Sequence, residues 1–525
     1  MVTKFKPLLG IFMFGLSMHT GAVSAADSST NAGQVEPMNV LFIMADNQPA
    51  AILGAYGNPD VRTPNINQLA SEGVLFTNAF AVNGMCSPTR ATLMTGLMPS
   101  QHGVHNWLDD AKLDEWPDDW SVVAEYRTLP QTLENRGYQT AMIGKWHMGQ
   151  PWQASIGYQH WVTFTYGHTL DFWDNTIVDN GETYQITDRH IVDFFTEEAV
   201  DYIENVDHDQ PFYLQLNFDG PYLNPPTNTG PARNRHYESY LDEDFESFPR
   251  VPVNENILDQ LLDPDTPAFM KNQHRQSILH HNDPESMANV ASQNTIVDDG
   301  VGRVLEALKQ AGLDQNTLVI YSSDQGNFYG QHGLWQHTIV TTPSNLYEAA
   351  LNIPLIIRHP GSIAAGETSD LFIGQYDMAT TILDYIGIDD VEFENSPGNS
   401  FANSLLGESI DWENEVYYEQ EESRGVRTPE FAYWKRIDSL GDSELYDMTN
   451  DPGQYFNLIA DPDYQSIAAE LDRKVRSFYE EYSTEKYDLW NGGTAKGSVA
   501  RPGIFQALHG DQWKTVSESL PPFEE

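Results

Sequence analysis

Short apolar runs that end in acidic or amide residues recur along the chain. Residues 39–45 (NVLFIMA) and 317–322 (TLVIYS) are apolar without alternation, and residues 211–218 (PFYLQLNF) repeat this design. Such runs are typical of strands that are buried on both faces of a parallel sheet. We therefore expect an α/β domain in which the polar residues that follow each strand gather at the carboxyl ends of the strands.

Between these strands the apolar residues recur with the spacing of an α-helix. One predicted helix carries five apolar residues on a single face, namely Val297, Val301, Val304, Leu305 and Leu308. A stripe of this width is typical of a helix that packs one face against a sheet.

The rest of the chain divides by pattern. Residues from about 225 to 285 are polar with little periodicity, which predicts a long excursion over the active face. After about residue 395, short strands and turns precede a helix at 464–482, which predicts a small C-terminal α+β domain with an antiparallel sheet. We expect a main domain at 26–395 and a small domain at 396–525, whose tail wraps back onto the main domain.

The first 25 residues have the pattern of a secretory signal. Lys4 and Lys6 precede an apolar stretch at 8–18, and small residues at 23–25 supply a cleavage site. The apolar stretch is too short to span a bilayer, and no other run is apolar enough to do so. We expect a periplasmic or secreted protein without membrane insertion.

Charge and cysteine content narrow the function further. The chain has 76 acidic and 28 basic residues, a net charge of −48, which makes nucleic acid an improbable partner. Its one cysteine, Cys86, excludes an intramolecular disulfide, which exported proteins often use. This lone cysteine therefore needs its own explanation.

Cys86 stands at the start of a predicted short helix. Ser87 suits an N-cap, Pro88 the first helical position and Gly96 the residue after the last turn. Cys86 then lies at the positive end of the helix dipole, and Arg90 can reach back toward it, so the site suits an anion. These local features also allow an activated thiolate nucleophile.

The string Cys86-Ser87-Pro88-Thr89-Arg90, with Thr-Gly five residues after the arginine, resembles the signature of the sulfatases. These belong to the wider alkaline-phosphatase-like superfamily, so the resemblance implies a mixed sheet flanked by helices. It also implies that a maturation enzyme oxidises Cys86 to formylglycine before export.

Two further segments resemble the metal-binding segments of that family. Asp46-Asn47 matches the first, with Asn47 in place of a second acid, and Asp324-Gln325 matches the second. Together with an oxygen of the modified Cys86 they imply a site built from oxygen atoms. That chemistry prefers Ca²⁺, with Mg²⁺ second, over Zn²⁺.

Gly144-Lys145-Trp146-His147 resembles the family's Gly-Lys-Trp-His segment. The resemblance implies that Lys145 holds sulfate oxygens and that His147 is the base when sulfate is released. Two positions depart from the family pattern, since Tyr222 replaces a common histidine and His337 a common lysine.

These departures leave the general acid open. A histidine donates a proton near neutral pH far more readily than a tyrosine, so we expect His337 to be the acid, with His332 as its competitor. Tyr222 is expected to bond to or pack against substrate, and His168 is a candidate for the pocket wall.

Export and aromatic richness favour a sulfated carbohydrate substrate outside the cell, such as fragments of algal polysaccharide, with carrageenan-like galactans as one candidate. Two other functions stay open. One is a phosphodiester or phosphonate monoester hydrolase, and the other a Ca²⁺-dependent glycan-binding protein whose Cys86 stays a thiol.

Overall fold

A computed structural model of the chain describes residues 37–108, 116–168, 171–222, 233–437 and 440–516. The expected signal sequence at 1–25 lies outside this part. No helix within the described ranges has the length and apolar character needed to cross a membrane.

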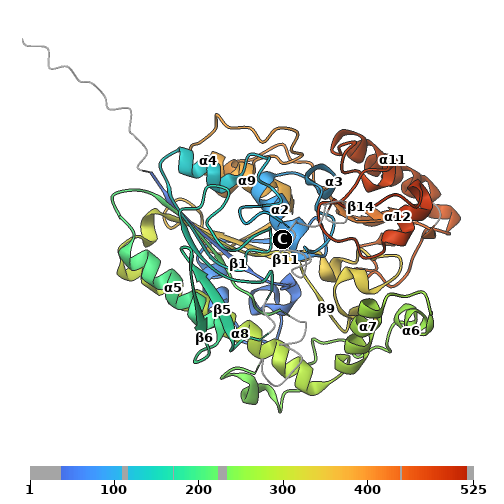
Figure 1. Ribbon diagram of the computed structural model, residues 1–525, viewed down its shortest axis with the longest axis horizontal. Helices are drawn as coiled ribbons and strands as arrows, with labels where there is room; N and C mark the ends of the chain where they lie inside the picture. Colours follow the sequence, from blue (N-terminus) through green and yellow to red (C-terminus); the bar gives the residue numbers. More distant parts are fainter. Residues whose placement is uncertain (1–36, 109–115, 169–170, 223–232, 438–439, 517–525) are drawn as a thin grey trace, which may run out of the picture. The chain divides into compact units, whose positions relative to one another are not determined.

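A ten-stranded mixed sheet forms the centre of the fold (Figure 1). Strand β1 pairs in parallel with β7 on one side and β8 on the other, and β7 pairs in parallel with β3. The three apolar runs are thus confirmed as strands, and the structure shows that they are neighbours at the centre of the sheet. In spatial order the strands are β12 (Glu367–Gly374), β2 (Val74–Phe80), β11 (Asn352–Arg358), β8 (Thr317–Ser323), β1 (Asn39–Ala45), β7 (Phe212–Asn217), β3 (Gln139–Gly144), β4 (His160–Phe164), β5 (Asn175–Asp179) and β6 (Glu182–Ile186).

Helices cover both faces of this sheet (Figure 1). Alternate residues of β1 explain why, since Phe42 joins the core on one face and Ile43 the core on the other. The first face is covered by α2 (Cys86–Thr95), α4 (Leu129–Asn135) and α9 (Met378–Tyr385). The second is covered by α1 (Pro64–Ser71), α5 (Ile191–Asn205) and α8 (Pro284–Gln310). The valines of the predicted amphipathic stripe on α8 are all buried.

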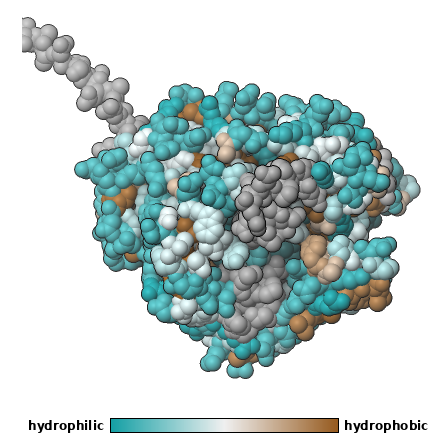
Figure 2. Space-filling model, in the orientation of Figure 1, coloured by the Kyte–Doolittle hydropathy of each residue, from teal (hydrophilic) through white to brown (hydrophobic). Residues whose placement is uncertain are grey.

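The segment expected to run over the active face contains two helices, α6 (Glu255–Leu262) and α7 (Ala268–His280). Figure 2 shows hydrophilic residues over most of the visible face and apolar residues in the region of these two helices, where Leu262 and Leu279 are exposed. Two short strands, β9 (Phe328–Tyr329) and β10 (Trp335–Gln336), lie next to α7. Two further helices, α3 (Pro99–His102) and α10 (Ala402–Leu405), are each a single turn long.

The C-terminal part has the expected antiparallel sheet and helix. Strands β13 (Val416–Gln420), β14 (Ser423–Arg427), β15 (Phe431–Arg436) and β16 (Glu444–Asp447) pair in sequence order. Helix α11 (Gln465–Glu481) packs its apolar face on this sheet. The tail, with α12 (Pro502–His509), returns to the main part, where the Lys496 N–H donates to the Gly103 carbonyl at 2.7 Å.

Candidate active site

Four charged side chains meet at one edge of the central sheet. Asp46 follows β1, Lys145 follows β3 and Asp324 follows β8, while Asp219 lies two residues after β7. The carboxyl ends of parallel strands lie at the same edge, so residues far apart in the sequence come together there. All four side chains are completely buried.

Cys86 faces this cluster from the first residue of α2. Its Sγ lies 3.6 Å from Asp46 Oδ1 and 3.9 Å from Asn47 Oδ1. Gln325 Nε2 and Lys145 Nζ approach the same sulfur to 3.2 and 3.5 Å. Four of the residues expected at the centre of the site therefore contact Cys86.

The start of α2 differs from the expectation for Ser87. The helix begins at Cys86 with Met85 as its N-cap, so Ser87 is not the cap. The Ser87 hydroxyl instead accepts a hydrogen bond from the Leu108 N–H at 3.0 Å, because a tertiary contact takes the group that would have capped the helix. Gly96 ends the helix with a left-handed conformation, φ 71°, as expected.

The guanidinium group of Arg90 binds a carboxylate and does not point toward the sulfur of Cys86. Its Nε and Nη2 donate to Asp324 Oδ2 at 3.0 and 2.7 Å, and its Nη1 donates to the Lys145 carbonyl at 2.9 Å. Lys145 in turn lies 2.6 Å from Asp46 Oδ2 and 3.8 Å from Asp219 Oδ1. Both cations are thus engaged by the acids that follow the strands.

Burial makes the charge balance of this cluster important. Three buried carboxylates face two buried cations, so one negative charge is left over. Burial, together with the nearby Asp46 charge, raises the pKa of Asp324 to about 6. Burial acts to raise the pKa of Asp46 too, but Lys145 and Arg90 hold it well below its usual range.

The same surroundings suppress the reactivity of an unmodified cysteine. Burial raises the pKa of the Cys86 thiol well above its usual range, and the attraction of Lys145 offsets only part of this rise. A thiol that stays protonated at neutral pH is a poor nucleophile. The activated thiolate that the local sequence allowed therefore finds no support in the structure.

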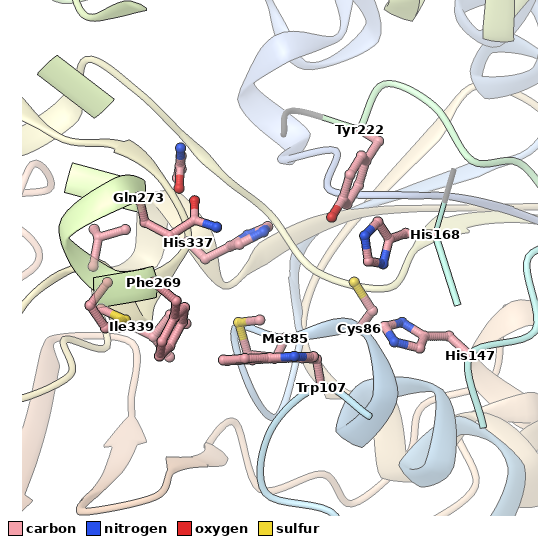
Figure 3. Close-up of a pocket in the computed structure, with 13 residues that line it drawn as sticks. Met85, Cys86, Trp107, His147, His168, Tyr222, Phe269, Gln273, His337 and Ile339 are labelled. Atoms are coloured by element: carbon pink, nitrogen blue, oxygen red, sulfur yellow. The ribbon is translucent and has the colours of Figure 1, made fainter. Parts of the chain in front are cut away.

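A cavity of about 200 Å³ opens above Cys86 (Figure 3). Four of the expected residues line it, namely His147, His168, Tyr222 and His337. The Tyr222 hydroxyl points into the cavity, and His337 and His147 approach from opposite sides of it. The Tyr222 ring also lies 4.7 Å from Lys145 Nζ, a cation–π distance.

His332, the other candidate for the general acid, is not among the residues that line this cavity. Its ring stacks on Tyr347 at a centroid distance of 3.7 Å and packs beside Tyr455. Only His337 of the two histidines therefore reaches the space above Cys86. Burial lowers the pKa of His337 to about 4, with Asp46 acting against this shift and Lys145 and His168 adding to it.

Eight further residues of the cavity wall were not expected from the sequence: Met85, Trp107, Phe269, Met270, Gln273, Gln336, Ile339 and Val340. They come from α7, from β10 and the short 3-10 helix that follows it at Thr338–Val340, and from loops, and they are far apart in the sequence. Gln336 could have been singled out by its place beside His337. The others show no local pattern that separates them from core residues.

Residues 38–388 match the sequence model of a protein family whose description is Sulfatase. The chain belongs to the sulfatase family. A second model, N-sulphoglucosamine sulphohydrolase, C-terminal, matches residues 330–481 and so includes the small antiparallel sheet. The chain is thus a sulfuric ester hydrolase, and the expected fold is confirmed.

Two curated relatives of this sulfatase match most of its length. It is 26% identical to an N-acetylglucosamine-6-O-sulfatase of Bacteroides thetaiotaomicron, over 86% of this chain and 88% of the relative. It is 24% identical to an ulvan-active sulfatase of Formosa agariphila, over 95% and 96%. A solved sulfatase structure in complex with its substrate D-glucosamine-2-N,6-O-disulfate matches with a TM-score of 0.66 and 25% identity, over 85% of this chain and 98% of that one.

The donor groups beside Cys86 fit the metal that this family implies. Donor atoms of Asp46, Cys86 and Asp324 lie within 4.8 Å of one another, and Asn47 Oδ1 contacts the same sulfur. The Gln325 amide lies beside them with its nitrogen toward the sulfur, so it would have to turn over to present its oxygen to a metal. Carboxylate and amide oxygens are ligands of hard divalent cations. A cation here would also balance the surplus negative charge of the buried cluster.

Proposed function

We propose that this sulfatase hydrolyses sulfate esters of poly- or oligosaccharides outside the cytoplasm, with Cys86 converted to formylglycine. The observation that carries the proposal is the position of Cys86. It lies at the floor of the cavity, in contact with Asp46, Asn47, Lys145 and Gln325. Relatives named for sulfated amino sugars and for ulvan support a carbohydrate substrate, and carrageenan-like galactans are one candidate.

Asp46, Asn47, Asp324 and Gln325 would hold Ca²⁺, with Mg²⁺ as second choice, together with an oxygen at position 86. When bound, the ion supplies positive charge for the sulfate oxygens and acidifies a hydroxyl beside it. Lys145, which is buried against Asp46, would add charge to the same sulfate oxygens. Arg90 acts through Asp324, whose carboxylate it orients.

The overall reaction consumes one water and converts a sulfate ester into an alcohol, sulfate and a proton. Hydrated formylglycine supplies one hydroxyl for attack on sulfur and a second whose deprotonation lets sulfate leave. An unmodified thiol has no such second hydroxyl, so it offers no comparable route for sulfate release. The protein's task is to position groups and to move protons.

His147 is built to accept the proton of the second hydroxyl. Its Nε2 lies 3.1 Å from the Leu108 carbonyl, and a carbonyl oxygen only accepts, so Nε2 carries the hydrogen. The basic lone pair of the neutral ring is therefore at Nδ1. The backbone of His147 is left-handed, with φ 54°, a strained conformation that is common at functional sites.

We assign the general acid to His337, which lies across the cavity from His147 (Figure 3). With a pKa near 4, the ring is neutral at pH 7 while no anion is bound. A sulfate ester in the cavity brings negative charge close to the ring and raises this pKa. Substrate binding itself would therefore load the proton that the departing alcohol needs.

The proposal extends to how the protein is made and where it acts. The N-terminal pattern supports export to the periplasm or beyond, and a maturation enzyme would act on Cys86 before that step. The acidic surface, with a net charge of −48, keeps such a protein soluble.

The deciding experiment is the mass of the tryptic peptide 63–90 from protein made in its native host, measured beside sulfate release from sulfated galactan oligosaccharides. We expect Cys86 to have lost sulfur and gained oxygen, and Cys86→Ala to release no sulfate. A chain that releases sulfate with Cys86 entirely as a thiol would overturn the modification. Faster hydrolysis of phosphate diesters or phosphonate monoesters than of every sulfate ester would overturn the substrate class.

A further inference from the structure

We propose that the sugar ring carrying the reacting sulfate has no other charged group, and that this ring stacks on Trp107 while its hydroxyls bond to Gln336 and Gln273. This inference rests on the proposed function and names its substrate more closely. It predicts a preference for sulfated neutral sugars over uronates and over rings with two sulfates.

Among the described residues, the cavity wall has no permanently charged side chain that could pair with a second anion. None of the thirteen residues that line it in the described part of the chain is a lysine, an arginine or a carboxylate. The two nearest buried cations, Arg90 and Lys145, are engaged by Asp324 and Asp46 below the cavity. A second sulfate or a carboxylate on the same ring would be desolvated without a partner, which is costly.

One side of the cavity is an aromatic and aliphatic surface suited to the apolar face of a sugar. Trp107 and Phe269 pack edge to face, with ring centroids 5.5 Å apart, and Phe269 is 41% exposed at the rim. Met85 and Ile339 lie beside them (Figure 3). Rings with one apolar face and polar edges stack well on such a surface.

Two amides on the wall supply uncharged polar groups. Gln336 is 1% exposed, and its Nε2 has no hydrogen-bond partner within the described structure. Gln273 Oε1 is likewise buried without a partner there. A buried polar atom without a partner is costly, so a ligand that satisfies it is stabilising. A hydroxyl can both accept from one amide and donate to the other, whereas a carboxylate or sulfate can only accept.

The backbone at Gln336 supports a role for this side chain. Its φ of 120° lies in the left-handed region that residues other than glycine rarely adopt. Strain of this kind persists where the surrounding structure enforces it, commonly at ligand sites. Pairing of β10 with β9 places Gln336 opposite Phe328, and His337, the proposed acid, follows directly.

The test is calorimetric binding of galactose 2-, 4- and 6-monosulfates and of the corresponding disulfates to the full chain loaded with Ca²⁺. We expect the best monosulfate to bind at least about 100-fold more tightly than any disulfate, since a buried unpaired charge is costly. Equal binding, or tighter binding of a disulfate or of D-glucosamine-2-N,6-O-disulfate, would overturn the inference.

Two lysine variants separate a local effect from a general one. Gln336→Lys places a cation on the cavity wall, where it can pair with a second sulfate. It should therefore lower the ratio of monosulfate to disulfate affinity at least about 10-fold. Gln310→Lys makes the same charge change at an exposed position of α8 outside the cavity, and it should leave the preference as it is. Equal effects of both variants would show that total charge, not the cavity wall, sets the preference.

Failure of the proposed function would give a different experimental result from failure of this inference. It would appear as no release of sulfate from any ester, including 4-methylumbelliferyl sulfate, by protein whose Cys86 has been converted. Binding still decides the inference in that case, because the calorimetric ranking of monosulfates and disulfates needs no turnover.

Discussion

Replacing Lys145 by methionine tests the charge balance beneath the cavity. The ammonium lies 2.6 Å from Asp46 and 3.8 Å from Asp219, and all three side chains are fully buried. Removing one partner of a buried pair leaves a charge without compensation, which costs about 3–5 kcal/mol. As a control, Arg136→Met breaks an ion pair with Asp390 whose side chains are 39% and 64% exposed, and it should cost about 0–1 kcal/mol.

The loss in Lys145→Met should depend on pH with a definite sign. In the wild type Lys145 and Arg90 lower the pKa of Asp46 against the effect of burial. Without Lys145, burial raises this pKa above the unfolded value of about 3.9. The unfolded chain then releases a proton that the folded chain retains, so the destabilisation grows as the pH rises from about 4 toward 8.

Urea unfolding of Lys145→Met and Arg136→Met at pH 5 and pH 8 measures these losses of stability, with a chelator present to remove divalent cations. The double variant Asp46→Asn/Lys145→Met removes both charges and should recover at least about 2 kcal/mol of the loss at pH 8. The reasoning is refuted if Lys145→Met costs no more than Arg136→Met. It is refuted equally if the loss of stability in Lys145→Met does not grow with pH. It is also refuted if the losses measured for Asp46→Asn alone and for Lys145→Met alone simply add in the double variant.

Three further predictions concern proton transfer, positioning and stability. His337→Ala should slow alkyl sulfates about 100-fold and aryl sulfates much less, because only poor leaving groups need a proton; equal slowing would remove His337 as the acid. Gln420 accepts hydrogen bonds from the Gly84 N–H at 3.3 Å and the Thr338 hydroxyl at 3.1 Å, so it ties together two segments beside the cavity. Gln420→Ala should lower kcat about 10-fold with Cys86 still converted, and an unchanged kcat would contradict this. Burial and the neighbouring Glu422 raise the pKa of Glu421 to about 8. The contribution of Glu421 to stability therefore falls as the pH rises from about 4.5 to 8, and Glu421→Gln, which does not titrate, should be about 1–3 kcal/mol more stable than wild type at pH 8. Thermal unfolding across this range measures the difference, and parallel pH profiles would contradict it.

The sequence determined the sheet and the centre of the site because both depend on local patterns. Buried parallel strands need continuous apolar runs, and the groups that follow such strands meet at one edge whatever lies between them in the sequence. Asp46 and Asp324 were identified in this way, and Cys86 by its short motif. The structure places one donor atom of each of these three residues within 4.8 Å of the others.

Local patterns were less able to predict how each side chain is used. Ser87 has the composition of an N-cap, but its hydroxyl bonds to Leu108 across the fold. Arg90 was expected to reach toward the anion site, and the structure shows its guanidinium group hydrogen-bonded to Asp324 instead. In both cases a partner distant in sequence competes with the local interaction, and only the folded chain decides which one forms.

The wall of the cavity was decided by tertiary structure alone. His332 and His337 are five residues apart in one segment, yet one packs against Tyr347 and the other reaches the space above Cys86. Trp107 and Phe269 come from separate segments whose aromatic residues look like core residues in the sequence. Which side chains line a cavity depends on how loops and helices pack against one another, and sequence spacing does not encode that packing. The groups that we propose to act on the sulfate could therefore be found from the sequence, whereas the surface that we propose to bind the sugar is formed only in the folded protein.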